Sequence, residues 1–351
     1  MSNKRLLDRY VSSKSCGTNG PIDLGTLPNS LLPYEHSDRF FDMVRDSSKF
    51  LQAIREVRTD ACKGVIHRLN LGEIVSEGAS ANSCFSLNSP TESQLTYELT
   101  KYRSGFTVGS DLLRCNIEKE RLVETLMNQF RTRIARDMER TAIMGDESLP
   151  MGQGQSKMNN LFGQNDGFLK LLESALPAEN VIDANKAALS TDLLFAIHNR
   201  VPIDYMGDIA DYKLICGPRL YNTWAQSLVS RDTMLGDSAV LSGGLYRPLG
   251  EQVFSVPNWP ENLDLGASET DGTTLIFSPM SNFIYFVGMD LTLERERVPR
   301  CDSWEYTMHW LCDFMVELPE MVVMVKNVRV CGTQWDGCAS GYGIANHNPL
   351  S

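Results

Sequence analysis

The chain has 351 residues, of which 42% are hydrophobic and 22% charged, a composition typical of a globular protein with a sizeable core. Its 33 Lys and Arg residues against 44 Asp and Glu residues leave a net charge of −11, which argues against a protein that coats nucleic acid with a cationic surface. We find no run of ~20 apolar residues for a membrane helix and no secretory signal at the first ten residues. We therefore expect neither a membrane protein nor an exported one.

Residues 1–36 are rich in Ser, Gly and Pro and contain few apolar residues, so they are not expected to fold on their own. Two interpretations remain open: a frayed terminus, or an arm that becomes ordered on a neighbouring molecule. After them, Ser37 and Asp38 can cap a helix with apolar residues at helical spacing. The pattern predicts a helix over residues 37–61 that leads into the next domain.

The apolar period then changes from helical to alternating. Leu69 and Leu71 alternate with polar residues, as do Leu95, Tyr97 and Leu99, and the segment between them is rich in Ser, Asn and Gly. This pattern predicts a long β-hairpin over residues 62–104 with an open tip at Ser76–Gln94. Because a ten-residue strand spans about 33 Å, the hairpin is long enough to leave the body of its own subunit. Long loops of this kind in compact domains tend to be functional.

The strongest helix signal covers residues 117–144 and ends before Gly145. Apolar residues recur at steps of four on one side: Leu122, Leu126, Phe130, Ile134 and Met138. The opposite side carries a charged set: Arg131, Arg133, Arg136, Asp137, Glu139 and Arg140. This charged side is interpreted either as a solvated face with internal ion pairs or as a contact surface.

The second half of the chain has a mixed α/β pattern. Helices are predicted from Ser190 to before Pro202 and over Arg219–Val229, with a short amphipathic piece earlier at Phe168–Leu176. Strands are predicted at Lys213–Cys216, Gln252–Val256, Thr274–Phe277, Phe283–Val287, Leu291–Glu294 and Met321–Val330. The Gly-rich tail that follows is expected to be peripheral, and Trp335–Cys338 within it could make a packing contact.

Motifs for chemistry are sparse. The five histidines fall into no metal-ligand spacing, and Gly152–Gln155 lacks the remaining residues of a phosphate-binding loop. Nine widely spaced cysteines without a C-x-x-C pair indicate free thiols in a reducing compartment, and Cys62, Cys216 and Cys312 are expected to be small core residues. We therefore predict no catalytic residue, cofactor or metal, and no enzyme.

Several segments in this order resemble one family. They are GEIVSEG (Gly72–Gly78), ELTKYRSGFTVGSDLL (Glu98–Leu113), AIMGD (Ala142–Asp146), LICGPR (Leu214–Arg219), FIYFVGMDLTLE (Phe283–Glu294) and FMVELPEMVVMVKNVRV (Phe314–Val330). Together they are similar to the major capsid proteins of tailed bacteriophages with the Hong Kong 97 fold. The order and spacing of the segments carry this resemblance, because each motif alone is weak.

The resemblance implies an α+β fold with an N-terminal arm, an extended β-hairpin loop, a peripheral domain with a long spine helix, and an axial domain. The expected division is 1–36 arm, 37–61 leading helix, 62–104 extended loop, 105–189 peripheral domain with spine helix 117–144, 190–312 axial domain, 313–332 return strand of the peripheral domain, and 333–351 tail. The implied function is that of a structural protein whose copies form hexamers and pentamers of an icosahedral phage head around double-stranded DNA.

The implied partners are other copies of the chain, a separate scaffolding protein, a portal protein and a decoration protein. A separate scaffold is expected because only about 36 residues precede the first helix. The packaged DNA would be enclosed without sequence-specific binding, no membrane would take part, and the protein would be found in the virion after assembly in the host cytoplasm. Some relatives cross-link through a lysine on the extended loop. Because the segment Gly64–Leu99 contains no lysine, with only Lys63 and Lys101 beside it, we predict no such bond.

Candidate contact residues between subunits follow from these expectations. At the hairpin tip they are Glu77, Asn82 and Phe85, with Glu77 a possible partner for the basic residues Arg131, Arg133 or Arg140. Near the ring centre we expect the loops Tyr205–Asp211 and Thr233–Gly244, with Tyr205 and Asp208 as candidates. The alternatives are an encapsulin-type or gene-transfer-agent shell, a tail or portal component and, in a different class, a cytosolic thiol enzyme.

Overall fold

The computed structural model describes residues 44–70, 76, 89–115, 121–229, 252–265, 271–288 and 292–330. Its helices are α3 (Lys49–Ala53), α4 (Ser110–Cys115), α5 (Arg121–Met144), α6 (Lys157–Phe162), α7 (Phe168–Ala175), α8 (Thr191–Arg200) and α9 (Pro218–Val229). Its strands are β1 (Arg55–Thr59), β2 (Lys63–Asn70), β3 (Thr91–Glu98), β4 (Thr100–Gly109), β5 (Val181–Asp183), β6 (Tyr212–Cys216), β7 (Gln252–Ser255), β8 (Gly272–Pro279), β9 (Phe283–Gly288), β10 (Thr292–Val298), β11 (Ser303–Val316) and β12 (Val323–Arg329). Short 3-10 turns join several of them: η1 (Ala178–Asn180), η2 (Ile203–Asp211), η4 (Met280–Asn282), η5 (Pro299–Cys301) and η6 (Pro319–Met321).

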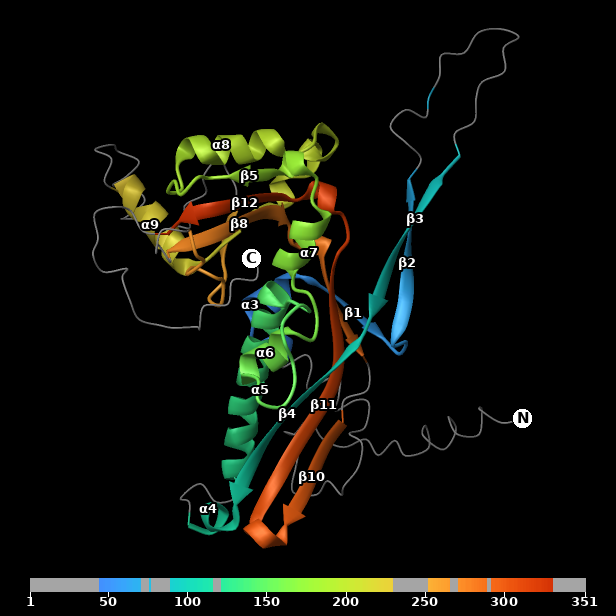
Figure 1. Cartoon of the computed structure of the whole chain (residues 1–351), viewed down its shortest axis with the longest axis vertical. Helices are drawn as coiled ribbons and strands as arrows, with labels where there is room; N and C mark the ends of the chain where they lie inside the picture. Colours follow the sequence, from blue (N-terminus) through green and yellow to red (C-terminus); the bar gives the residue numbers. More distant parts are fainter. Residues whose placement is uncertain are drawn as a thin grey trace.

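The first sheet is built around the long strand β11. Strands β1, β9, β11 and β10 pair in this order, and β4 pairs with β11 from Gly109↔Ser303 to Thr100↔Cys312. Alternate residues of β11 are buried, so one face of the sheet carries the aromatic side chains Tyr306 and Trp310. Helix α5 packs along this face, where Phe106 of β4 meets Phe130 of α5 at 4.9 Å between ring centres (Figure 1).

The second sheet has the order β5-β12-β8-β6-β7. Its outer face is covered by α8 and α9, which bury Ile197 and Trp224 in one core with Phe277 of β8. Its inner face contributes Ile276 and Met324 to the core of the first sheet. Because helices cover one face and the first core covers the other, every residue of β8 is buried.

Two of the passages of the chain between the sheets run close together, through η4 after β8 and through η6 before β12. Asn282 of η4 ties these crossings together: its side-chain amide donates to the carbonyl of Leu318 (2.9 Å) and accepts from the N–H of Leu318 (2.7 Å). Its backbone carbonyl accepts from the N–H of Glu317 (3.0 Å). A buried side chain with all its polar atoms paired specifies one arrangement of the two segments. The relative position of the sheets is therefore fixed at this point.

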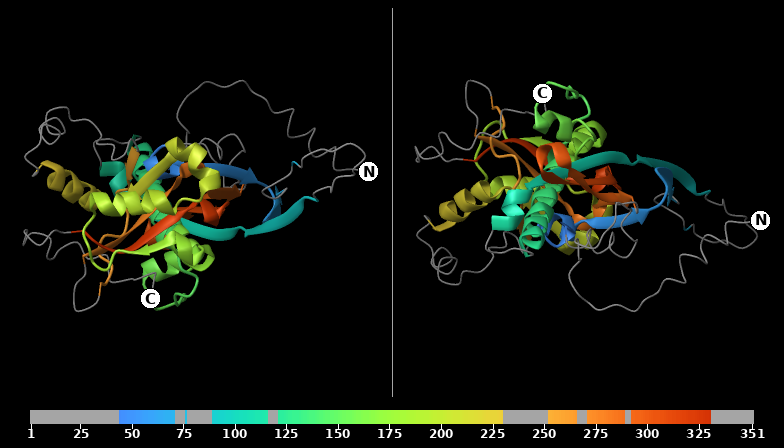
Figure 2. Two further views of the ribbon diagram at one scale, coloured as in Figure 1. Left: turned by 90° about the horizontal axis from the view of Figure 1, so that it is seen from above. Right: turned by 90° about the horizontal axis from the view of Figure 1, so that it is seen from below.

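Strands β2 and β3 form a separate two-stranded ribbon in register from Lys63↔Glu98 to Asn70↔Thr91. The ribbon extends beyond the two-sheet body (Figure 1), and the views from above and below show it leaving the body sideways (Figure 2). The predicted hairpin strands, the long helix ending at Met144 and the helices near 191–200 and 218–229 are thus confirmed. Of the predicted tip Ser76–Gln94, residues 77–88 lie outside the described residues, whereas residues 91–94 belong to β3 and not to an open tip.

The structure corrects three of the sequence-based expectations. The predicted helix 37–61 ends at Ala53, because Arg55–Thr59 pairs in parallel with β9 and this tertiary pairing overrides the local helical spacing. Strands β9 and β10 and most of β11 fall in the expected axial domain 190–312. They lie instead in the first sheet, along which α5 packs. Conversely β12, within the expected return strand 313–332 of the peripheral domain, lies in the second sheet beside β5 and β8.

Candidate functional site

The β2–β3 ribbon has two unlike faces. On one face Val65, His67 and Leu69 point to solvent, and Leu69 is 73% exposed. On the other face Ile66, Leu95 and Tyr97 are half-buried and pack against the cluster of Leu99, Ile284, Phe286 and Met315. Side chains alternate between the faces of a strand, so one ribbon both attaches to the body and presents an open surface. In the described part of the chain, nothing covers Leu69.

The root of the ribbon is its end at the pair Lys63↔Glu98, where it meets the body, and a contact between aromatic rings fixes it. The ring of Tyr97 stacks on Phe286 of β9, with 4.5 Å between the ring centres and 11° between their planes. The Tyr97 hydroxyl also hydrogen-bonds the hydroxyl of Thr59 at 3.1 Å. Gly64, opposite Tyr97 in the ribbon, has no room for a Cβ atom, because that atom would overlap the Tyr97 ring. The angle at which the ribbon leaves the body is therefore set by packed rings.

A group of acidic side chains lies where the ribbon meets β11 and the end of α5. The carboxylate of Asp313 accepts the backbone N–H of Glu98 (3.0 Å) and that of Phe314 (2.8 Å). Burial, together with the nearby carboxylates of Glu147 and Glu98, raises the pKa of Asp313 to about 6. Burial also raises the pKa of Glu147, with further contributions from Asp166, Glu98 and Asp146. Mutual repulsion between these carboxylates is thus built into the root of the ribbon.

The Gly-Asp pair at the end of α5 has a structural explanation. A Cβ atom on Gly145 would overlap the backbone oxygen of Asn165, so only glycine allows the chain to pass this close. Asp146 is buried and accepts from the N–H (2.9 Å) and the hydroxyl (2.6 Å) of Ser148, with Lys170 at 3.5 Å. Burial opposes ionisation of Asp146, but these hydrogen bonds and Lys170 hold its pKa below the usual value. The motif is a fixed corner after the helix.

A polar contact joins the ribbon to the second sheet. Arg68 of β2 donates from Nη2 to Oε1 of Glu320 in η6 at 3.2 Å. Tyr205 of η2 hydrogen-bonds the same carboxylate, and burial followed by Glu320 raises the pKa of Tyr205. This Arg68–Glu320–Tyr205 contact spans three segments that are distant in sequence. It gives the ribbon a second attachment beyond its root.

The sequence-predicted site residues fall into different surroundings. Glu77, Asn82, Phe85 and the stretch Thr233–Gly244 lie outside the described residues. On α5, Arg133 is exposed, whereas Arg131 and Arg140 are half-buried, and Arg140 donates to Oδ1 of Asn258 at 3.2 Å. Asp208 lies in η2, and nothing is described of its side chain. Of the predicted site residues that the structure describes, Tyr205 is linked to the ribbon indirectly, because it shares the Glu320 carboxylate with Arg68.

Glu139 was predicted on the charged side of α5 but is buried, at 3% exposure. Its carboxylate accepts from the Ser48 hydroxyl at the start of α3 and from the amide of Asn258 at 2.7 Å. It therefore links α3, α5 and the loop after β7. The sequence contains a signal for this burial, because Ala135 and Ile143, four residues to either side, are both apolar.

The cysteine predictions hold in part. Cys216 and Cys312 are buried as expected, whereas Cys62 is exposed at the turn before β2. Within the described ranges, no three His, Cys, Asp or Glu side chains come together as metal ligands. None of the helices described here is both long and apolar enough to cross a membrane.

Comparison with known proteins finds one fold throughout. No family model matches the chain. It is 23% identical over 326 residues to YqbE of Bacillus subtilis (strain 168), whose name describes a prophage capsid protein, covering 92% of this chain and 99% of that protein. Among solved structures, it resembles the procapsid of satellite phage P4 with its size determination protein, at a TM-score of 0.64 and 16% identity over 94% of this chain and 98% of that one.

Two other kinds of particle share the architecture. The capsid of a native gene-transfer-agent particle matches with a TM-score of 0.57 and 12% identity, over 91% of this chain and 98% of that one. The SrpI encapsulin of Synechococcus elongatus PCC 7942 matches with a TM-score of 0.50 and 10% identity, over 93% of this chain and 96% of that one. The chain therefore has the mixed α+β Hong Kong 97 capsid fold, and the resemblance inferred from its sequence is confirmed.

Proposed function

We propose that this protein is the major capsid protein of a tailed bacteriophage or prophage, and that its copies assemble into hexamers and pentamers of an icosahedral head enclosing double-stranded DNA. The observation that carries the proposal is the ribbon, which is rigid at its root and leaves Leu69 73% exposed in the described residues of a single chain. Removing an exposed apolar side chain from water is favourable, so a projecting ribbon with Leu69 and Val65 on its open face gains from being covered. A neighbouring copy would bury it.

The contacts in such a ring are heterologous, because each copy presents the ribbon to a different surface of the next copy. A ribbon held at its root limits the rotation between neighbours to a narrow range, which has to include the rotations of both a hexamer and a pentamer for either ring to close. The tip residues Glu77, Asn82 and Phe85 would continue the contact, with Arg133 an exposed basic partner on α5. Each contact needs to supply only a few kcal/mol, since every subunit makes many of them.

The ring centre is assigned to the second sheet and its loops, Tyr205–Asp211 and Thr233–Gly244. Tyr205 itself is engaged with Glu320 of its own chain. Ile203, which is 85% exposed in the same turn, is the better candidate for a contact with other copies. The remaining assignments are a separate scaffolding protein, a portal at one vertex, a decoration protein, an N-terminal arm that orders on neighbours, and residence in the virion after assembly in the host cytoplasm.

A shell of a different kind is the second candidate, because gene-transfer-agent and encapsulin structures share the fold. The contents of the particle separate these candidates. Nuclease-resistant DNA of phage-genome length indicates a phage head, short DNA fragments a gene-transfer agent, and a protein cargo without DNA an encapsulin. Purified particles can be analysed for both components in one experiment.

The assembly proposal is tested by placing a charge on the open face of the ribbon. Leu69→Glu should leave the subunit folded and abolish shells seen by negative-stain microscopy and megadalton sedimentation. Phe195→Glu, at a residue 50% exposed on α8, is the control with the same charge placed away from the ribbon. A wild-type protein that stays at about 39 kDa with and without candidate scaffolds would refute the proposal. Normal shells from Leu69→Glu would refute the role of the ribbon.

A further inference from the structure

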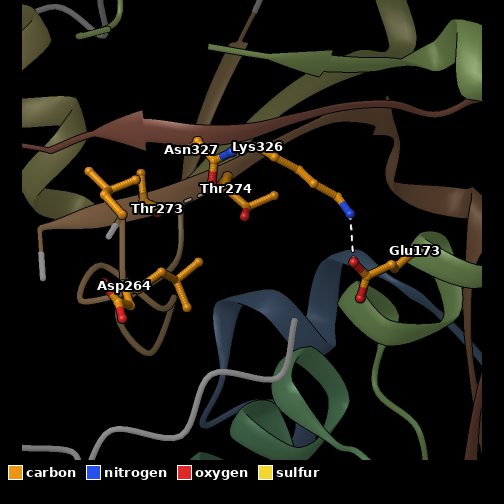
Figure 3. A pocket seen from close by; sticks show the side chains of 8 residues that line it. Glu173, Asp264, Thr273, Thr274, Lys326 and Asn327 are labelled. Atoms are coloured by element: carbon orange, nitrogen blue, oxygen red, sulfur yellow. Dashed lines mark hydrogen bonds and ion pairs between the residues drawn. The ribbon is translucent and has the colours of Figure 1, made fainter. Parts of the chain in front are cut away.

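A cavity of about 240 Å³ lies between α7 and the second sheet. Its lining comes from α7, the loop before β8, β8 and β12: Glu173, Leu263, Asp264, Leu265, Thr273, Thr274, Lys326 and Asn327 (Figure 3). Helix α7 belongs with the first sheet, because Phe168, Leu169 and Leu172 are buried in the core that this sheet shares with α5. The cavity therefore separates two units: the first sheet with α5, α6 and α7, and the second sheet with α8 and α9.

The second-sheet unit is held together at the edge that lies over the cavity. The side chain of Asn327 donates to Oδ1 of Asp183 at 3.0 Å, and the N–H of Ala184 donates to the carbonyl of Lys326 at 3.0 Å. The N–H of Lys186 donates to the carbonyl of Asn327 at the same distance, 3.0 Å. These bonds join β5 to β12 where the register of β12 against β8 shifts, so β5 and β12 move together if they move at all.

Two links tie this unit to the first-sheet unit near the two ends of β8. After β8, Asn282 joins η4 to η6 at the crossings described above. Towards the start of β8, the side chain of Asn258 donates to Oε1 of the buried Glu139 on α5 at 2.7 Å. The neighbouring Trp259 donates from its indole N–H to the backbone carbonyl of Thr274 in β8 at 2.7 Å. Two fixed points leave a rigid unit free to turn only about the line through them, and this line follows β8.

A third link lies to one side of this line and crosses the cavity. Nζ of Lys326 on β12 is 2.6 Å from Oε1 of Glu173 on α7, and the two side chains are 25% and 29% exposed (Figure 3). Both side chains contain several rotatable bonds, so the pair can persist while the backbones move closer or apart. The apolar contact between the units includes Met324, whose flexible side chain adapts to small shifts in packing. The link that sets the angle about β8 is therefore the most adjustable of the three.

We propose that the second-sheet unit rocks about the line through Asn282 and Asn258, and that the Lys326–Glu173 pair sets its angle. The task of this hinge rests on the proposed function: one chain has to fit rings of five and of six copies, in which the rotations between neighbours differ by about 12°. Because neighbouring strands lie about 4.8 Å apart, a rotation of about 12° moves β12 by about 1 Å and β5 by about 2 Å. A close-packed interior resists such movement, and the cavity gives it room.

Spin labels on the unassembled full-length subunit test whether the pair sets the angle. Attached through keto-bearing amino acids at the exposed positions Lys157 on α6 and Asp192 on α8, they leave the native cysteines unlabelled and report the distance between the two units. Glu173→Ala should broaden the distance distribution measured by double electron–electron resonance at least about 1.5-fold. Lys326→Ala, which removes the same pair from the other side, should give the same width.

Asp271→Ala is the matched control for Glu173→Ala. It also removes a carboxylate that faces a cation of β12, but its ion pair with Arg329, at 3.5 Å, lies within the second-sheet unit. This change should leave the distance distribution as narrow as in the wild type. Equal widths in the wild type and Glu173→Ala, or equal broadening by Glu173→Ala and Asp271→Ala, would overturn the proposal.

The assembled shell tests whether the two rings use the hinge. Subunits of five-membered and six-membered rings, taken from one cryo-electron microscopy reconstruction of the wild-type shell, are superposed on the first-sheet unit. Their second-sheet units should differ by a rotation of at least about 5° about the line along β8. Identical second-sheet units in both rings would overturn the task assigned to the hinge. A chain that forms no shell would refute the proposed function instead, and the spin-label distances would still decide whether the hinge exists.

Discussion

The two ends of the described ribbon are built for different purposes, although they belong to the same pair of strands. At the root, Tyr97 stacks on Phe286 and Gly64 leaves room for the ring, so the side chains serve the fold. Towards the tip, Leu69 is 73% exposed, and among the described residues it is Arg68, paired with Glu320, that attaches this part to the body. Stability is therefore expected to depend on the root, and association on the outer part.

This difference shows how a projecting ribbon can be both stiff and available. An isolated two-stranded hairpin is at best marginally stable in water, so an exposed ribbon needs an external support. Burial of the root supplies that support without covering the outer part. The predictions below test whether the division is real, beginning with the largest expected effect.

Removing the contact between aromatic rings at the root should destabilise the whole subunit. Phe286→Ala deletes a fully buried ring from β9 and its stacking with Tyr97, and we expect a loss of about 3–5 kcal/mol in the free energy of unfolding. Chemical denaturation of the unassembled subunit measures this loss. Leu69→Ala, at the other end of the ribbon, should change it by less than about 0.5 kcal/mol. Equal losses from the two changes would remove the distinction between root and outer part.

The acidic group at the root predicts an unusual pH dependence. The pKa of Asp313 in the folded state is about 6, above its ordinary value of 3.8, so the native state binds a proton more tightly than the unfolded state does. Stability from this residue is therefore greatest below pH 4 and falls as the pH rises through 6, by roughly 3 kcal/mol in all. Denaturation curves between pH 4 and 7 should show a smaller decline in Asp313→Asn than in the wild type.

Asp146 provides a control of opposite sign for that experiment. Burial opposes its ionisation, but the Ser148 hydrogen bonds and Lys170 lower its pKa from 3.8, so its contribution is present at neutral pH and lost as the pH falls below that value. Asp146→Asn should therefore reduce stability at pH 7 and matter less in acid. Parallel pH profiles for the two asparagine variants would show that neither carboxyl has the environment described here.

The sequence predicted those elements whose buried residues recur at a regular local spacing. The ribbon strands alternate cleanly, and α5 ends at Met144 beside Gly145, as its spacing indicates. The 14-residue strand β11, the longest described here, was not predicted as a strand, although its sequence carries the signal. Glu305 and Asp313 stand at the polar positions of an unbroken alternation, whose apolar members are Trp304, Tyr306, Met308, Trp310, Cys312 and Phe314. The assignment of strands to sheets also failed, since the chain crosses between the sheets at Asn282 and Leu318 through contacts that local periodicity does not encode.

The candidate site was less predictable for the same reason. Arg68 and Glu320 are 252 positions apart, and Glu98 and Asp313 are 215 apart, so neither contact leaves a local signature. What the sequence did indicate was the presence of an outstretched ribbon. How that ribbon is held depends on which distant residues the fold brings to its root.

Filling the space beside Tyr97 should have a moderate effect. A methyl group in Gly64→Ala would overlap the Tyr97 ring, and moving the ring off Phe286 is expected to cost about 1–3 kcal/mol. Gly109→Ala is the matched control, because it is also a strand glycine but its Cβ would meet no atom within 4 Å. In thermal unfolding, the melting temperature should therefore fall in Gly64→Ala and stay unchanged or rise in Gly109→Ala. A neutral Gly64→Ala would mean that the ring is not confined.

The smallest expected effect on stability belongs to Arg68. Its pair with Glu320 is partly exposed, and pairs of this kind contribute about 0–1 kcal/mol, so Arg68→Ala should barely change the denaturation midpoint. Arg55→Ala, which breaks a comparable pair with Glu317 at 2.8 Å, is its control. Hydrogen exchange distinguishes the two: only Arg68→Ala should reduce protection in the outer half of β2, because Arg68 ties that half to the body and Arg55 lies outside the ribbon. If both variants left the ribbon equally protected, the root alone would set its angle, and the Arg68–Glu320–Tyr205 contact would have no part in presenting the open face.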